Sequence, residues 1–223
     1  MAAMDSRSFV QHLQNVYTEA VSDRRFIYAE WFKQKGDRLR EAYRQLACAY
    51  WASSEVHAKA QARFEQVLRI DTKIKLARQV WEEARHCKDV TRLLKESFRE
   101  NFKADDYEPV PELTKCFYDY YGNIDDVGGY FAAHNMAGER TALLMLEEAA
   151  VFARAESMGS LARFAEKVIP EERLHVRLGE EIVGEFAVDE DTQERLEEHF
   201  KKGLEAHWNY TEGVYQKITS LNG

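Results

Sequence analysis

The sequence predicts an all-α fold: two antiparallel helical hairpins, a long crossover link between them, and further helices at both ends. Three observations predict it. Pro109, Pro111 and Pro170 are the only prolines among 223 residues, so most of the chain lacks the residue that breaks helices. The proline-free stretches are rich in the strong helix formers Ala, Leu, Glu, Lys, Arg and Gln. Signals for strands are weak, because apolar residues recur at helical spacing rather than in alternation.

The N-terminal half predicts three helices. Residues 6–21 carry an apolar face and form the first. Gly36 precedes the first bundle helix, which we expect over residues 37–70. Asp71 can cap the second bundle helix, which we expect over residues 71–102.

The C-terminal half predicts a second hairpin after a long link. The link contains two prolines and a short amphipathic piece at residues 112–121. We expect the third bundle helix over residues 127–156, a turn at Ser157-Met158-Gly159-Ser160, and the fourth bundle helix over residues 160–186. A terminal helix follows at about residues 189–220. A link of about 25 residues is long for a helical protein and suits a connection that crosses the length of a bundle.

Two Glu-x-x-His motifs carry the functional signal. They are Glu83-Ala84-Arg85-His86 and Glu172-Arg173-Leu174-His175, each in the second helix of an expected hairpin. Residues three apart share one face of a helix, so each motif can turn a carboxylate and an imidazole toward one metal ion. With seven His and 39 acidic residues in the chain, about one such pair is expected by chance. The motifs therefore indicate a metal site only if carboxylates on neighbouring helices face them.

Each motif has a candidate partner carboxylate on the preceding helix. Glu55 precedes Glu83 by 28 residues, and the midpoint falls at Arg69, beside the expected helix start. Glu139 precedes Glu172 by 33 residues, and the midpoint falls just before the second turn signal. Residues equidistant from a turn lie at the same height in antiparallel helices. Each Glu is therefore expected to meet its own motif.

Other acids and histidines compete for these roles. The competing acids are Glu41 and Glu65 for the position of Glu55, and Glu147 and Glu148 for the position of Glu139. None of these four is equidistant from its turn with the motif glutamate. In isolation, each motif also fits a solvated ion network on a helix surface. The apolar stripes around the motifs favour metal ligands, because burying so many charges without a cation costs several kcal/mol each. His57 and His134 are expected in the core or at the rim rather than as ligands.

The resulting pattern resembles the ferritin-like di-iron carboxylate proteins, over about residues 38–187. The predicted metal-ligating and catalytic residues are Glu55, Glu83, His86, Glu139, Glu172 and His175. Within that group, the segments 134–140 and 170–179 look most like the phenylacetyl-CoA oxygenase catalytic-subunit family. The tRNA-modifying di-iron hydroxylases and the cyanobacterial aldehyde-deformylating oxygenases are similar in size and motif.

The resemblance implies an O₂-dependent oxygenase or oxidase with two iron ions, manganese being the alternative metal. It would act on a small organic or acyl substrate, and we expect a separate reductase and a homodimer. Glu82 and Glu171, which precede the motif glutamates, would accept the outer N–H of the ligand histidines across the site. A ferroxidase, a rubrerythrin-like or a manganese-catalase-like protein is the second reading, against which stands the lack of a rubredoxin-type cysteine cluster.

Composition excludes several other classes. The net charge of −8 argues against a broad nucleic-acid surface. The three cysteines are odd in number and lack Cys-x-x-Cys spacing, so neither a disulfide framework nor a zinc site is expected. The start has no signal-peptide pattern, and no apolar run approaches the length of a membrane span. We expect one domain over residues 1–223 in a reducing cytoplasm.

Overall fold

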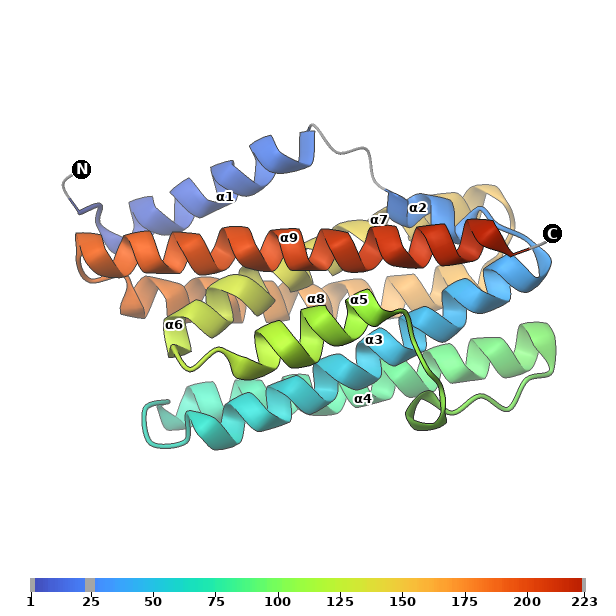
Figure 1. Cartoon of the computed structure of the whole chain (residues 1–223), viewed down its shortest axis with the longest axis horizontal. Helices are drawn as coiled ribbons and strands as arrows, with labels where there is room; N and C mark the ends of the chain where they lie inside the picture. The colour runs from blue at the N-terminus through green and yellow to red at the C-terminus, as the bar shows by residue number, and fades with distance from the viewer. Residues whose placement is uncertain (1–2, 23–26, 222–223) are drawn as a thin grey trace.

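The computed structural model describes residues 3–22 and 27–221, and within that part of the chain every regular element is a helix, as predicted. The α-helices are α1 (Ser6–Ser22), α2 (Ile27–Phe32), α3 (Gly36–Arg63), α4 (Ile70–Phe98), α5 (Pro111–Thr114), α6 (Val127–Tyr130), α7 (Arg140–Ala155), α8 (Gly159–Phe186) and α9 (Glu190–Ser220) (Figure 1). The 3₁₀ segments are η1 (Ala104–Asp106) and η3 (Tyr121–Asn123), and the π-helical segments are η2 (Lys115–Tyr120) and η4 (Phe131–Glu139).

The two predicted hairpins are present. Helices α3 and α4 form the first, and α3 ends at Arg63, earlier than expected. Asp71 lies in the first turn of α4 and does not cap it, because Arg69 occupies the cap position. Helices α7 and α8 form the second hairpin, which turns at the predicted place through Ser157 with φ at 59°.

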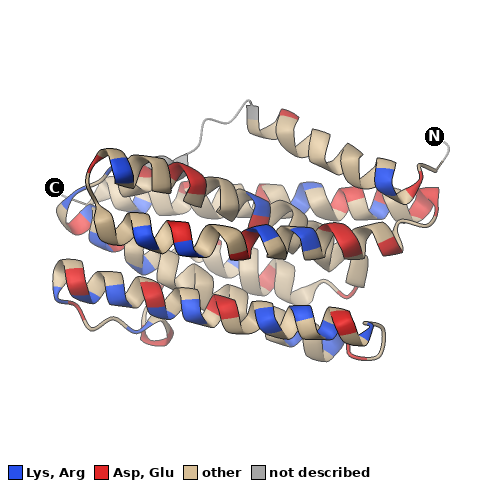
Figure 2. Ribbon diagram, turned by 180° about the vertical axis from the view of Figure 1, so that it is seen from behind, with Lys and Arg blue, Asp and Glu red and all other residues tan. Residues whose placement is uncertain are grey.

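A ladder of ion pairs joins α4 to α8 at the back of the bundle, where the two helices lie side by side (Figure 2). The pairs are Lys75–Glu181, Glu82–His175, Arg85–Glu171 and Asp89–Lys167. Each step forward along α4 is matched, to within one residue, by a step back along α8, which is the register of an antiparallel pair. The second helices of the two hairpins therefore face each other along their length.

The crossover link between α4 and α6 is fixed to the bundle by one buried carboxylate. Glu41 of α3 is 3% exposed. It accepts hydrogen bonds from the Tyr107 hydroxyl at 2.7 Å and from Gln45 Nε2 at 2.8 Å, and Lys217 of α9 lies 3.1 Å from it. Glu41 therefore ties α3, the link and α9 together.

The segment η4 is held between α8 and α9 at backbone distance. A Cβ added to Gly179 of α8 would lie 2.6 Å from Asn135 Cβ, and one added to Gly203 of α9 would lie 2.5 Å from the Ala133 carbonyl oxygen. Only glycine allows this approach. As predicted, the start of α9 is at Asp189, which caps the helix: its side chain accepts a hydrogen bond from the Thr192 amide at 2.9 Å.

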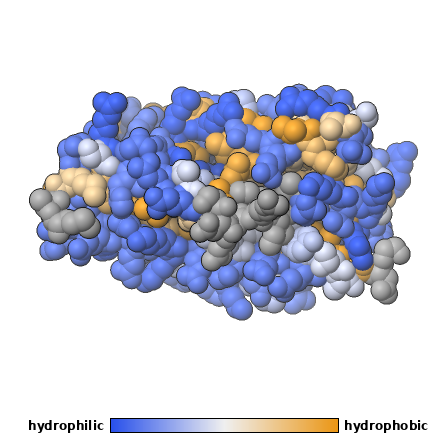
Figure 3. Space-filling view, turned by 90° about the horizontal axis from the view of Figure 1, so that it is seen from above, coloured by the Kyte–Doolittle hydropathy of each residue, from blue (hydrophilic) through white to orange (hydrophobic). Residues whose placement is uncertain are grey.

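The surface seen from above is mainly hydrophilic, with apolar side chains in patches between the charged ones (Figure 3). Within residues 3–22 and 27–221, no helix combines the length and the apolar composition that crossing a membrane requires.

Candidate metal centre

Three buried carboxylates and one imidazole converge between the two hairpins. Glu83 of α4, Glu139 at the end of η4, and Glu172 and His175 of α8 offer ligand atoms within 4.8 Å of one another. Each of the four residues is at most 4% exposed. These buried groups can hold a metal ion, and they are four of the six residues that the sequence predicted.

His86 joins the group as a fifth residue. It is fully buried, and its Nδ1 lies 3.5 Å from Glu172 Oε1 and 3.9 Å from Glu83 Oε1. Both Glu-x-x-His motifs thus turn their carboxylate and their imidazole toward one place, as the helical spacing predicted.

The inner atoms of this group lack hydrogen bonds. Both oxygens of Glu83, Oε1 of Glu172 and Nδ1 of His86 make none to any residue in the described part of the chain. His175 Nδ1 lies 3.0 Å from Glu172 Oε2 and 3.1 Å from Glu83 Oε1, but one N–H serves only one of them. Each buried polar atom left unpaired costs about 1–3 kcal/mol. A cation bound here would satisfy all of them, so the residues fit a metal.

The outer nitrogens of both histidines are held by carboxylates from the opposite helix. His86 Nε2 lies 2.8 Å from Glu171 Oε2, and His175 Nε2 lies 3.1 Å from Glu82 Oε2. This crossed arrangement is the one expected of the residues that precede the motif glutamates. With Nε2 occupied, each imidazole turns Nδ1 inward, which is how carboxylates orient metal-bound histidines.

The group without a cation holds protons at neutral pH. Burial raises the pKa of Glu172 to about 8 and that of Glu139 to about 7, and the charge of Glu83 adds to both shifts. Burial acts to lower the pKa of His86, but Glu171 and Glu83 outweigh it and raise that pKa to about 9. Burial acts to raise the pKa of Glu83, yet the imidazoles of His175 and His86 outweigh it and lower that pKa. Metal binding must displace these protons.

Glu55, the sixth predicted ligand, lies outside the group. Its carboxylate accepts a hydrogen bond from the Tyr118 hydroxyl of the crossover link at 2.5 Å. Ser53 and His57, four residues apart on α3, are buried and turn toward the site. Glu55 is two residues from each, so it points about 160° away from them. Glu55 therefore does not lie on the helix face that the predicted match requires.

His57 and His134 are buried as expected, but they contact the site. His57 Nε2 lies 3.0 Å and His134 Nε2 lies 3.7 Å from Glu139 Oε1. The π-helical winding of η4 explains the contact of His134. Residues five apart diverge by about 140° on an α-helix, but they lie one turn apart on a π-helix. If the segment is taken to be an α-helix, the spacing places His134 on a different face from Glu139, which is not where it lies.

The two histidines form a hydrogen-bonded cluster beside Glu139. Their rings are stacked 4.2 Å apart at 8°, and the Tyr130 hydroxyl lies 2.7 Å from His57 Nδ1 and 3.0 Å from His134 Nδ1. A hydroxyl carries one proton, so Tyr130 donates to one ring and accepts from the other. Burial lowers the pKa of His57 to about 3, so this ring is neutral. With Glu139 these two histidines can also hold a metal ion. Parallel rings, however, direct their nitrogen lone pairs side by side, which suits a support for Glu139 better than a shared ion.

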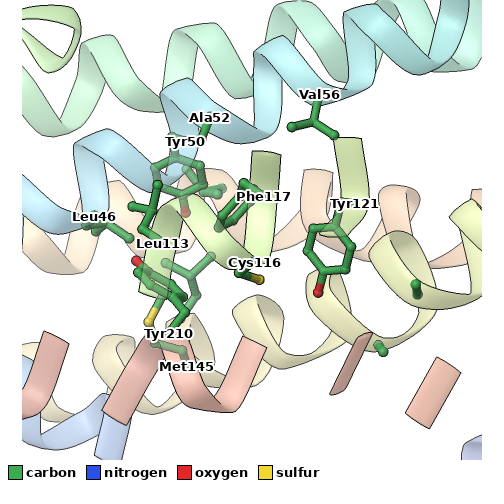
Figure 4. Close-up of a cluster of buried hydrophobic side chains, with 14 of the residues drawn as sticks. Leu46, Tyr50, Ala52, Val56, Leu113, Cys116, Phe117, Tyr121, Met145 and Tyr210 are labelled. Atoms are coloured by element: carbon green, nitrogen blue, oxygen red, sulfur yellow. The ribbon is translucent and has the colours of Figure 1, made fainter. Parts of the chain in front are cut away.

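A small cavity of about 30 Å³ lies against Glu83 and Glu139. Its apolar wall is formed by Leu46 and Tyr50 of α3, Phe117 of η2, Met145 of α7 and Tyr210 of α9 (Figure 4). Ser53 and His134 add polar atoms. The space is large enough for a molecule of a few atoms, and most of its wall is apolar.

Comparisons of the chain with protein-family models, with curated proteins and with solved structures give no match. The chemistry of the site therefore follows from its own atoms.

Proposed function

We propose that the chain is a non-haem di-iron oxidoreductase on a ferritin-like bundle, an O₂-dependent oxygenase or oxidase of a small organic substrate. The observation that carries the proposal is the buried group of carboxylates and imidazoles whose inner atoms lack hydrogen bonds. The residues that would hold the ions are Glu83, His86, Glu139, Glu172 and His175.

The donor set suits iron or manganese. Carboxylate oxygens and imidazole nitrogens are hard or borderline donors, and the group offers no sulfur ligand. When bound, the two ions would supply a place for O₂ to bind and the electrons that reduce it. Glu83, Glu139 and Glu172 offset three of the four positive charges of two divalent ions. Glu55 does not supply a fourth carboxylate, so the centre would be less anionic than the sequence predicted.

The chain's own residues position this chemistry and keep water out. Glu171 and Glu82 fix the imidazoles of His86 and His175. Glu139 Oε1 lies 3.0 Å from both Gln79 Nε2 and His57 Nε2, which fixes one oxygen and leaves the other for the centre. The apolar cavity wall favours a compact apolar substrate over a charged one.

Anaerobic loading with Fe²⁺ tests the proposal. We expect about two ions per chain by elemental analysis, followed by rapid O₂ consumption when air is admitted. The electrons must come from outside, because the sequence carries no flavin or iron–sulfur motif. A protein that binds no iron, or whose iron does not consume O₂, would contradict the proposal.

Peroxide handling is the second candidate, and the size of the cavity favours it. A space of about 30 Å³ admits O₂ or hydrogen peroxide without movement of side chains, whereas an organic substrate requires rearrangement. Hydrogen peroxide added to the iron-loaded or manganese-loaded protein distinguishes the two. Sustained O₂ release without any reductant favours a catalase-like role over the oxygenase.

A further inference from the structure

A large aromatic side chain lies exposed on the outer face of α4. Trp81 is 61% exposed, and Ile74 on the same stripe is also 61% exposed. Residues seven apart lie almost above each other on a helix. The two side chains therefore form an apolar patch in solvent, on the side of α4 that faces away from α3 and the core.

Three contacts connect this patch to an inner histidine. The Arg85 guanidinium lies 4.9 Å from the centre of the Trp81 ring, and it forms an ion pair with Glu171 Oε2. The same oxygen lies 2.8 Å from Nε2 of His86, which is fully buried. No other exposed tryptophan of the described residues has such a connection to the centre.

The charges around Trp81 are mainly positive, although the chain as a whole is acidic. The exposed charged residues of α4 are Lys75, Arg78, Lys88, Arg92 and Lys95 against Asp71 and Glu96. Arg78 and Arg92 pair with Glu82 and Asp89. Both acids are buried, so these pairs present their guanidinium groups to solvent.

We infer that Ile74, Arg78, Trp81, Lys88 and Arg92, here named the Trp81 face, form the docking surface for a small acidic iron–sulfur protein that carries one electron. The inference rests on the proposed function. Each encounter oxidises the reduced cluster by one electron and lowers one ferric ion to ferrous, so two encounters reduce a two-ion centre. The Trp81–Arg85–Glu171–His86 contacts connect this face to the centre for that electron.

A second copy of the chain fits this surface less well. A two-fold dimer brings the same face of both copies together, so Arg78, Lys88 and Arg92 of one copy would meet the same cations of the other. Like charges placed against each other cost several kcal/mol. An acidic partner instead gains attraction from the same residues, and its association would weaken as salt is added.

The test compares two reductants on the iron-loaded full chain. The probe protein is a reduced plant-type [2Fe–2S] ferredoxin, and the small reductant is dithionite, which needs no docking surface. We expect Trp81→Ala and Lys88→Glu each to weaken ferredoxin binding and slow ferredoxin-driven reduction by about tenfold, with no change in the dithionite rate or in iron content. Lys201→Glu on α9, also an exposed lysine, is the matched control and should change neither.

The outcomes separate the docking inference from the proposed function. Equal ferredoxin binding and equal rates in wild type, Trp81→Ala and Lys88→Glu would overturn the inference, as would a wild-type dimer that Trp81→Ala converts to monomer. Failure of dithionite to reduce any bound metal would instead overturn the proposed function. Ferredoxin binding measured by calorimetry on the metal-free protein would still test the surface in that case.

Discussion

The two hairpins contribute unequally to the centre. From the first hairpin, α4 supplies Glu83 and His86 to the main group, and α3 turns Ser53 and His57 inward instead of a carboxylate. The second hairpin and the η4 segment before it supply Glu139, Glu172 and His175. The spacing of the motifs in the sequence is nearly symmetric, whereas the site is not.

The difference teaches that equal distance from a turn fixes the height of a residue but not the face on which it lies. Glu139 reaches the interior at the end of a π-helical segment, and Glu55 of the regular helix α3 does not. The following predictions test this asymmetry, beginning with the largest expected effect.

Removing one carboxylate from each hairpin should affect the iron content differently. We expect Glu172→Ala to reduce bound iron from about two ions per chain to at most one, because Glu172 approaches both His86 and His175. Glu55→Ala should leave the iron content unchanged. Elemental analysis after anaerobic loading measures both. Iron loss in Glu55→Ala equal to that in Glu172→Ala would restore a symmetric site.

The carboxylates on the two sides of the site should also differ in protonation, and the protons held by the site make metal binding depend on pH. Burial raises the pKa values of Glu172 and Glu139 to about 8 and about 7, and carboxylates raise that of His86 to about 9, whereas the pKa of Glu83 is lowered. Ions bind the deprotonated groups, so affinity should rise from pH 6 to pH 9, by about tenfold per pH unit for each proton displaced. Calorimetry in two buffers of different ionisation enthalpy should show proton release at pH 7. Affinity that is flat over this range would contradict the shifts.

Tight packing against η4 predicts a stability effect that is confined to one side of α8. A Cβ at Gly179 would lie 2.6 Å from Asn135 Cβ and 3.1 Å from the Met136 amide nitrogen, so Gly179→Ala should destabilise the fold by about 1–3 kcal/mol. Gly184→Ala on the same helix is the control. Its nearest contact would be Val10 Cγ2 at 3.7 Å, and it should be neutral or stabilise by up to about 1 kcal/mol. Thermal unfolding compares the two variants. Equal shifts of the melting temperature would show that η4 moves aside to make room for the added Cβ.

Two buried tyrosines give the smallest expected contrast. Tyr130→Phe removes the hydroxyl shared by His57 and His134 and should cost about 1–3 kcal/mol, because buried ring nitrogens lose their partner. The Tyr50 hydroxyl has no hydrogen bond to any described residue, so Tyr50→Phe should be neutral or slightly stabilising. Chemical denaturation measures both. If Tyr50→Phe lost more stability than Tyr130→Phe, the supporting hydroxyl would not be that of Tyr130.

Much of this could be predicted from the sequence, because it depends on local periodicity. The helices, the Ser157 turn, the long link and the inward faces of both Glu-x-x-His motifs all follow from spacing along regular helices. The crossed contacts of Glu82 and Glu171 are the ones that the family resemblance implied. Glu55 and His134 do not, because each depends on which way one residue of a long helix faces.

Local sequence patterns only partly indicate the helix faces on which Glu55 and His134 lie. On α3, the inward pair Ser53 and His57 at four-residue spacing was a usable signal, and it was outweighed by the distance of Glu55 from the turn. On η4, the π-helical winding depends on packing against Gly179 and Gly203, which are far away in the sequence. No local pattern in residues 131–139 indicates it.

The winding of η4 has a consequence for how this chain can be aligned with others. A π-helical segment contains more residues per turn than an α-helix of the same length. An alignment without gaps to a chain that is α-helical here can match either Tyr130 and His134 or Glu139 to residues in equivalent places, but not both. Deleting one residue between His134 and Glu139 would allow the segment to wind as an α-helix with these two residues four apart and still on one face. We therefore expect a single-residue gap in this segment when the chain is aligned with one that is α-helical here.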